Sequence, residues 1–378
     1  MRRSRPRLVA AVLIPACMSS LAGAGAGPGQ PVRVDPGATL TRIAFGSCAR
    51  ERREQPVWDD ILATDPELFL FIGDNQYADF WEKDGEMVME PVPGPARILE
   101  AYLELGTKPG YQALRARCPI LATWDDHDYG ANDAGSDFAF RAESQELFAG
   151  FFGLGADHPV RNGQEGVYQR YTFGPVGRRL QVILLDTRYH RDPLDRASER
   201  PRGLGPYTPT EDETRTMLGE AQWAWLEECL REPAEIRLIA SSVQVVAWEH
   251  GWETWGNMPH ERQRLYDLID ETDASGVFFI SGDRHLMEIS ADRGLRGAEV
   301  PYPMWDFTSS GMTEDGVREV VDPNSYRVGP VHRRTNFGLI EIDWGQSGGE
   351  PSVSFEGYAE GGTLLTRQTV FLSELRED

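Results

Sequence analysis

The chain has 378 residues, of which 40% are apolar, and 60 aspartates and glutamates outnumber 38 lysines and arginines to give a formal net charge of −22. This charge argues against a nucleic-acid-binding protein, because contacts to phosphate backbones need a basic surface. The length fits one large α/β domain or two ordinary domains, and the apolar share is enough for a sizeable core.

Residues 1–26 have the pattern of an export signal. The basic start "MRRSRPR" precedes the short apolar run "LVAAVLIPA" and the small residues "LAGAGAG", which offer cleavage near Ala24 or Ala26. A lipoprotein signal acylated at Cys17, a twin-arginine signal and a plain Ala-rich tail are the alternatives. The apolar run is too short to span a bilayer. We therefore expect an exported protein, periplasmic, secreted or at the cell surface, with no transmembrane segment after signal removal.

Residues 27–38 are rich in Pro and Gly and form a predicted linker, and residues 39–378 are expected to form a single domain. Three cysteines lie beyond the signal, at Cys48, Cys118 and Cys229. An odd number excludes a complete disulfide framework in an exported protein. We expect Cys118 and Cys229 in the core.

Six short apolar runs each stop at a polar cluster. They lie within residues 42–48, 67–77, 118–128, 180–188, 236–244 and 276–285. Runs of this length, rich in Ile, Val, Leu and Phe, are typical of strands buried on both faces.

Helical patterns lie between these predicted strands, at residues 55–65, 217–230 and 258–270. The second helix is expected to bury one face, made of Leu218, Ala221, Trp225, Leu226 and Cys229. Alternating strands and helices indicate an α/β domain. The tail from residue 337 alternates in hydrophobicity and predicts antiparallel strands, either a second sheet or the edge of the first.

Ligands of open α/β sheets bind beyond the carboxyl ends of the strands, and all six polar clusters stand there. The side chains gathered at this rim are Cys48, Asp74, Asn75, Asp125, Asp126, His127, Arg188, Gln244, Asp283 and His285. Carboxylates, an amide and imidazoles suit Mn, Fe, Zn, Mg or Ca, and a thiolate favours Fe or Zn. Two metals ~3.5–4 Å apart would need a shared carboxylate, and Asp74 in "GDN" is the natural bridge. Such a pair would attract an anionic substrate against the negative field of the whole chain.

In this order, "GSC", "GDNQYAD", "WDDHD", "LDTR", "LGEAQWAWL" and "SGDRH" resemble the alkaline phosphatase D (PhoD-like) branch of the calcineurin-like metallophosphoesterases. The resemblance covers roughly residues 42–345. It implies a four-layer αββα sandwich with the metal site at the carboxyl ends of the strands, and hydrolysis of phosphomonoesters or phosphodiesters by an exported enzyme. It also implies two or more metal ions, iron with calcium, with manganese or zinc as alternatives.

The resemblance assigns roles to individual residues. Asp74 matches the aspartate of the "GD" turn that bridges the metals. Asp126 and His127 match a metal ligand followed by a histidine that acts as an acid or stabilises the phosphate.

The last turn of the motif set, "GDRH", matches "GHxH" with Asp283 in place of the first histidine and His285 as the second. Cys48 stands where the "DxH" turn of the wider superfamily is missing. The metal ligands that follow from the resemblance are Cys48, Asp74, Asn75, Asp126, Asp283 and His285.

Arg188 is the second predicted catalytic residue after His127, as a fork for phosphate oxygens. Its alternative is an ion pair with a core carboxylate, Asp186. Gln244 is predicted to bind at the substrate as an amide donor to a metal-bound water, and Tyr77 is predicted to bind substrate as well.

Trp255 is the third predicted substrate-binding residue. With Trp248 and Trp252 it forms either the wall of the substrate pocket or the core of a loop. The turn residues Asp125, Asp128, Asn132 and Asp133 either cap the turn or offer oxygens to metal such as calcium.

We therefore predict a metal-dependent phosphoesterase of the alkaline phosphatase type that uses metal-activated hydroxide. The alternative is an extracellular phosphodiesterase acting on lipid head groups, cell-wall polymers or nucleotides, and a non-catalytic metal-binding protein is a third. The expected partner is a small phosphate ester or a phosphodiester polymer, without sequence-specific binding of nucleic acid.

Overall fold

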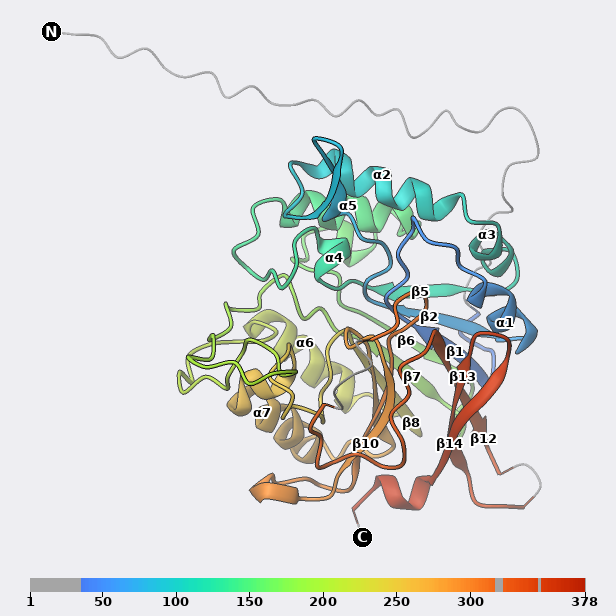
Figure 1. The fold of residues 1–378 in the computed structure, drawn as a ribbon. Coiled ribbons are helices and arrows are strands. Elements are labelled where there is room, and N and C mark those ends of the chain that lie inside the picture. The colour runs from blue at the N-terminus through green and yellow to red at the C-terminus, as the bar shows by residue number, and fades with distance from the viewer. Residues whose placement is uncertain (1–34, 317–321, 346–347, 378) are drawn as a thin grey trace, which may run out of the picture.

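The computed structural model describes residues 35–316, 322–345 and 348–377 (Figure 1). The predicted signal at 1–26, with Cys17, and residues 27–34 of the predicted linker lie outside the described residues. Within those described ranges no helix is long and apolar enough to cross a membrane.

The first sheet has six strands in the order β14-β13-β12-β1-β2-β5. Its parallel half contains β1 (Arg42–Gly46), β2 (Leu68–Ile72) and β5 (Ile120–Thr123). Its antiparallel half contains β12 (Asn336–Asp343), β13 (Ser352–Ala359) and β14 (Thr363–Phe371). The antiparallel tail expected from the sequence is confirmed, and it extends the first sheet to its edge.

The second sheet has the order β10-β11-β9-β8-β7-β6. Its four central strands run parallel, β7 (Leu180–Leu184), β8 (Ile236–Ser241), β9 (Val277–Ser281) and β11 (Met304–Ser309). The edge strands β6 (Gln169–Phe173) and β10 (Met287–Asp292) are antiparallel to their neighbours. A small hairpin, β3 (Phe80–Lys83) and β4 (Glu86–Met89), stands apart. The six predicted strands are confirmed, three in each large sheet.

Helices gather at the two sheets (Figure 1). Beside the first sheet lie α1 (Val57–Ala63), α2 (Pro95–Gly106), α3 (Pro109–Arg115), the single turn α4 (Asp126–Tyr129) and α5 (Arg141–Phe151). Beside the second lie α6 (Glu220–Arg231) and α7 (Pro259–Glu271). Short 3₁₀ turns complete the described elements at η1 (Pro159–Arg161), η2 (Trp255–Asn257), η3 (Leu295–Gly297) and η4 (Leu372–Leu375).

The three predicted helices correspond to α1, α6 and α7, but the predicted buried face of α6 is partly wrong. The helix buries Gln222 and Trp223, whereas Ala221 is exposed and Trp225 is only partly buried. The reason is a pair of hydrogen bonds: the Gln222 amide donates to the backbone carbonyl of Asp186 and its Oε1 accepts from the backbone N–H of Asp186, both at 2.8 Å. These bonds fix the rotation of the helix.

The side chains of β2 divide the core in two. Leu68, Leu70 and Ile72 belong to the cluster that contains the strands of the second sheet with α6 and α7. Phe69 and Phe71 point the other way and pack on Trp58 of α1, with ring centroids 5.5 and 5.7 Å away. Each of these buried side chains contributes roughly 1.5–3 kcal/mol of hydrophobic stabilisation. The strand that leads to Asp74 is therefore held rigidly from both faces.

Candidate active site

Loops that follow the strands of both sheets meet at one edge. Because the carboxyl ends of parallel strands face the same way, Cys48 after β1, Asp74 after β2 and Asp283 after β9 come together. Cys48, Asp74, Asp283 and His285 all have positive φ angles, of 61°, 50°, 67° and 52°. Non-glycine residues adopt this conformation rarely, and such strain gathers at functional sites.

Ligand atoms from these loops form overlapping groups. Cys48, Asp74 and His285 form the first group, and Asp74, Asp126 and His127 form the second. A third group contains Asp125, Asp126 and Asp283. Within each group, one side-chain N, O or S atom of every residue lies within 4.8 Å of the others. Asp74 is shared by the first two groups, which is the place that a bridging carboxylate needs.

Three buried oxygen atoms of the site fit a cation. Asp74 Oδ1, Asn75 Oδ1 and Asp125 Oδ2 are buried, and none has a hydrogen-bond partner among the described residues. The amide nitrogen of Asn75 donates to the carbonyl of Thr123 at 2.9 Å and to Asp128, which orients its Oδ1 away from both. A buried polar oxygen costs about 1–3 kcal/mol unless a hydrogen-bond donor or a cation binds it. Hard cations prefer such carboxylate and amide oxygens.

The pKa shifts of the site residues also favour a bound cation. Burial raises the pKa of the Cys48 thiol, and the Asp74 carboxylate raises it further. Burial also raises the pKa of Asp74, and Asp126 adds to the effect while His127 opposes it. A bound cation acts in the opposite sense, because it favours the thiolate and the carboxylate. Burial lowers the pKa of His285 to about 3, which leaves the neutral imidazole that a metal requires.

His127 is the second residue of α4 and is fixed from two sides. Its Nδ1 lies 2.8 Å from Oδ1 of Asp79, and its ring stacks on Tyr77 with centroids 4.2 Å apart. Burial opposes a charge on His127, but the carboxylates of Asp126 and Asp79 outweigh burial and raise its pKa. Asp79 was not predicted as a site residue, although it closes the motif "GDNQYAD". Its position becomes a signal only once its histidine partner is known.

Arg188 is fully buried and paired with carboxylates. Its Nε donates to Asp125 Oδ1 at 2.6 Å, and its two terminal nitrogens donate to Glu253 at 2.9 and 2.7 Å. The alternative of a core ion pair is therefore what the structure shows, but with Asp125 and Glu253. Asp186, the partner expected from the sequence, instead accepts the backbone N–H groups of Arg188 and Tyr189. Glu253 was not predicted, because it comes from a loop rather than from a strand end.

The predicted substrate-binding residues lie in three different places. The Tyr77 hydroxyl donates to Asp74 Oδ2 at 3.0 Å and lies 3.2 Å from Nε2 of His285, so it belongs with the first ligand group. The Gln244 amide donates to Glu288 and Thr308, both at 2.8 Å, and is fully buried.

Trp255 lies in the core, where its Nε1 donates to Ser241 and its ring contacts Trp223 at 6.0 Å. Of the tryptophans named from the sequence, it is Trp252 that lines a cavity beside the ligand groups.

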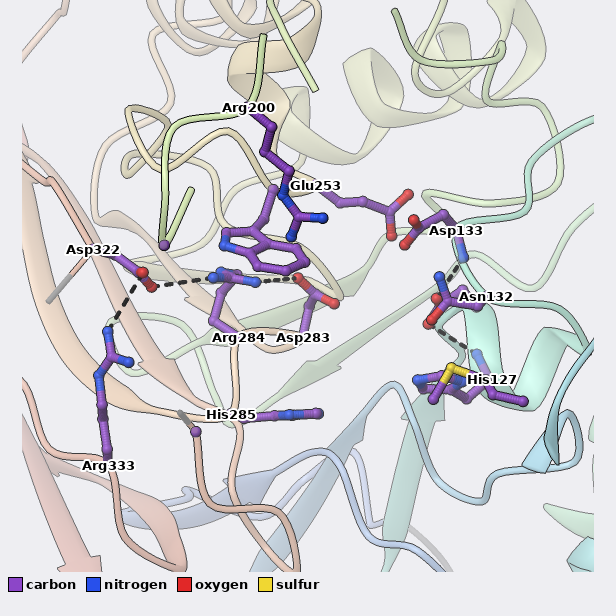
Figure 2. A pocket seen from close by; sticks show the side chains of 15 residues that line it. His127, Asn132, Asp133, Arg200, Glu253, Asp283, Arg284, His285, Asp322 and Arg333 are labelled. Carbon is purple, nitrogen blue, oxygen red and sulfur yellow. Dashed lines mark hydrogen bonds and ion pairs between the residues drawn. The ribbon is translucent and has the colours of Figure 1, made fainter. Parts of the chain in front are cut away.

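That cavity measures about 460 Å³ and opens over the ligand groups. Figure 2 shows His127, Asp133 and Glu253 on one side of it and Arg284 and Arg333 toward the other. A second cavity of about 560 Å³ shares two wall residues with it, Asn132 and Asp133. The lining of the cavity therefore combines acids and imidazoles with three guanidinium groups, and Asp322 lies beside two of these.

Comparisons with known proteins agree with this geometry. The family model described as PhoD-like phosphatase matches residues 43–336. Alkaline phosphatase D of Bacillus subtilis (strain 168) is 27% identical over 194 residues, which cover 46% of this chain and 32% of that protein, so the match spans about a third of the relative's length. A solved structure titled "Structure of PhoD" shares the fold with a TM-score of 0.64 at 17% identity, over 91% of this chain and 75% of that chain. The family match covers most of the chain, and the protein belongs to the PhoD-like phosphatase family.

Proposed function

We propose that this chain is an exported, metal-dependent phosphoesterase that hydrolyses phosphate esters. The observation that carries the proposal is that Asp74 and Asp125, which belong to overlapping groups of ligand residues, and Asn75, the residue after Asp74, each keep a buried oxygen without a partner among the described residues. Membership of the PhoD-like phosphatase family supports the class of bond. Export is proposed from the composition of residues 1–26, and residues 39–378 are proposed as one catalytic domain.

Two or more metal ions are proposed for the site. Cys48, Asp74 and His285 would hold one ion, and Asp126 with Asn75 would join Asp74 in holding another. A site with one thiolate among oxygens and imidazole suits iron beside calcium, with manganese or zinc as alternatives. When bound, such ions polarise the phosphoryl group and lower the pKa of the attacking water.

His127 is the proposed acid. Asp79 accepts from Nδ1, so the other ring nitrogen, Nε2, is the one available to the cavity that His127 lines. The raised pKa keeps a proton on the ring, which His127 can donate to the leaving oxygen or to the phosphoryl group. Arg188 has its donors engaged by Asp125 and Glu253, which supports a positioning role for it rather than a fork on the phosphate.

The layer order is also proposed rather than only the α/β class. The two sheets share one core cluster, and α1, α2, α3 and α5 pack on the outer face of the first sheet. With α6 and α7 on the second sheet, this packing supports a four-layer αββα sandwich.

A phosphodiesterase is the second candidate. The observation that favours it is the second cavity, which shares Asn132 and Asp133 with the first and gives room for a substituent on each side of a diester. Lipid head groups, cell-wall polymers and nucleotides are the diesters that we propose, without sequence-specific recognition of nucleic acid.

Hydrolysis of mono- and bis-p-nitrophenyl phosphate by the metal-loaded protein tests both candidates. A higher kcat/KM for the monoester supports the phosphatase, and the reverse order supports the diesterase. Asp126→Asn should lower either rate at least 100-fold, whereas Asp292→Asn, at the far end of β10, should not. Bound metal without turnover of either ester would indicate a non-catalytic metal-binding protein and would remove the proposal.

A further inference from the structure

The cavity has three arginines in its lining that the proposed chemistry does not use. Arg200, Arg284 and Arg333 line it, in a chain whose formal net charge is −22. Local positive charge in an acidic protein raises the local concentration of anions. The arginines can bind an anion only where carboxylates of the chain do not already neutralise their charge.

Arg284 is only partly neutralised. Its Nη2 lies 3.1 Å from Asp322 Oδ2, but Asp322 also pairs with Arg333, at 3.4 Å. Its Nη1 lies 3.7 Å from Asp283, a metal ligand predicted from the sequence. The Arg284 side chain is 10% exposed, and its Nε donates to no described residue. This buried Nε–H is a donor in need of an acceptor.

Arg200 is exposed, and its polar contacts with described residues involve no carboxylate. Its Nε donates to the carbonyl of Leu204 at 2.8 Å, and its guanidinium lies over the indole of Trp252, 5.0 Å from the ring centre. Arg284 lies over the same ring at 4.9 Å. Both guanidinium groups are thus gathered at Trp252, and Figure 2 shows Arg200 reaching toward Arg284.

The loop that carries Arg200 is fixed to the loop that carries Trp252. The backbone N–H groups of Gly205 and Tyr207 donate to the carbonyls of His250 and Gly251, both at 2.8 Å. The approach is so close that a Cβ on Gly205 would lie 2.0 Å from the Gly251 carbonyl oxygen. The backbone of the loop that carries Arg200 is therefore held in place, which lowers the entropic cost of binding a ligand through the Arg200 side chain.

We propose that Arg200 and Arg284, gathered on Trp252, bind a second phosphate group of the substrate, distinct from the phosphoryl group that reacts. The proposal rests on the proposed function and names its substrate class, which is phosphate esters that carry another phosphate. A planar guanidinium binds phosphate through paired N–H donors.

The test compares substrates that differ only in the second phosphate. The pairs are 3-hydroxypropyl phosphate against 1,3-propanediol bisphosphate, and the p-nitrophenyl diesters of the same two compounds. A charge-assisted contact at a partly exposed site should raise kcat/KM about tenfold for the compound with the second phosphate. Arg200→Gln should remove most of this ratio. The matched control Arg178→Gln, an exposed arginine in the turn before β7 and away from the site, should keep it.

Three results would overturn the proposal. The first is an equal kcat/KM for the two members of each substrate pair, and the second is an equal loss of the kcat/KM ratio in Arg200→Gln and Arg178→Gln. The third is that Arg200→Gln lowers kcat/KM by the same factor for both members of a pair. The last result would place Arg200 on the reacting phosphoryl group. If the wild-type protein hydrolyses none of the esters, the proposed function fails and calorimetry decides the inference separately. Tighter binding of propane-1,3-bisphosphonate than of propylphosphonate supports the inference, provided that Arg200→Gln weakens this binding and Arg178→Gln does not. Equal binding of the two compounds overturns it.

Discussion

Asp79→Asn removes the carboxylate that holds His127 while leaving the volume of the side chain almost unchanged. Asp79 is fully buried and accepts from Nδ1 of His127 at 2.8 Å, so no water can replace it without rearrangement. A hydrogen bond to a charged group contributes about 1.5–3 kcal/mol. Since each 1.36 kcal/mol is a factor of ten in rate, we expect kcat to fall roughly 10- to 150-fold.

The assay is steady-state hydrolysis of p-nitrophenyl phosphate and of an alkyl phosphate by metal-loaded protein. The loss should be larger for the alkyl ester, because an alkoxide leaving group needs the proton of His127 more than p-nitrophenolate does. A purely structural role for Asp79 would lower both rates equally.

The matched control is Asp292→Asn, which also alters a fully buried carboxylate, one that accepts from Arg262 at 2.6 Å at the far end of β10. It should lower the melting temperature without changing kcat. A kcat for folded Asp79→Asn within threefold of wild type would refute the reasoning, as would an equal loss of kcat in the control.

Three further predictions follow from the site. Cys48→Ser should lower the content of tightly bound transition metal, measured by elemental analysis of folded protein, and an unchanged content would remove Cys48 from the ligand set. Chelation should lower the melting temperature by about 4 °C per ion, because an ion present at 100 times its Kd contributes ~2.7 kcal/mol to the folded state of a domain of this size; an unchanged melting temperature would argue against a metal among these buried oxygens. Trp252→Leu should raise KM, whereas Trp255→Phe should lower the unfolding free energy by roughly 1–3 kcal/mol with KM unchanged. A raised KM in Trp255→Phe and an unchanged KM in Trp252→Leu would show that the cavity wall has been misidentified.

The strands could be predicted from the sequence, but their distribution between two sheets could not. The run "LFLFI" of β2 is apolar at every position, so it predicts a strand buried on both faces. Because every residue of the run is apolar, the sequence does not show which face of β2 packs on the second sheet. The packing of Phe69 and Phe71 on Trp58 shows that their face packs on α1 instead.

Strand-end residues of the site were predictable for a simple reason. Asp74, Asp126 and Asp283 each follow a buried strand, and parallel strands bring such ends to one edge. Asp79 and Glu253 lie in loops whose course depends on long-range contacts, so no local pattern pointed to them.

The position of Trp255 in the core could not be predicted from the sequence pattern, because a short turn determines it. The Thr254 hydroxyl lies 2.8 and 2.7 Å from the carbonyls of Gln244 and Ala247, either of which can accept its one hydrogen, and this contact holds the turn η2 against the segment that follows β8. The turn then directs Trp255 into the core, while Trp252, three residues earlier, remains at the cavity.

The most direct test of a metal-dependent phosphoesterase is reversible chelation of the native protein, with metal content and turnover of p-nitrophenyl phosphate measured on the same samples. We predict that the protein contains iron or another transition metal, with or without calcium. Turnover should fall with the metal content and return when metal is restored, and Asp74→Asn should show neither full metal content nor turnover. A folded, metal-free protein with undiminished turnover would contradict the account.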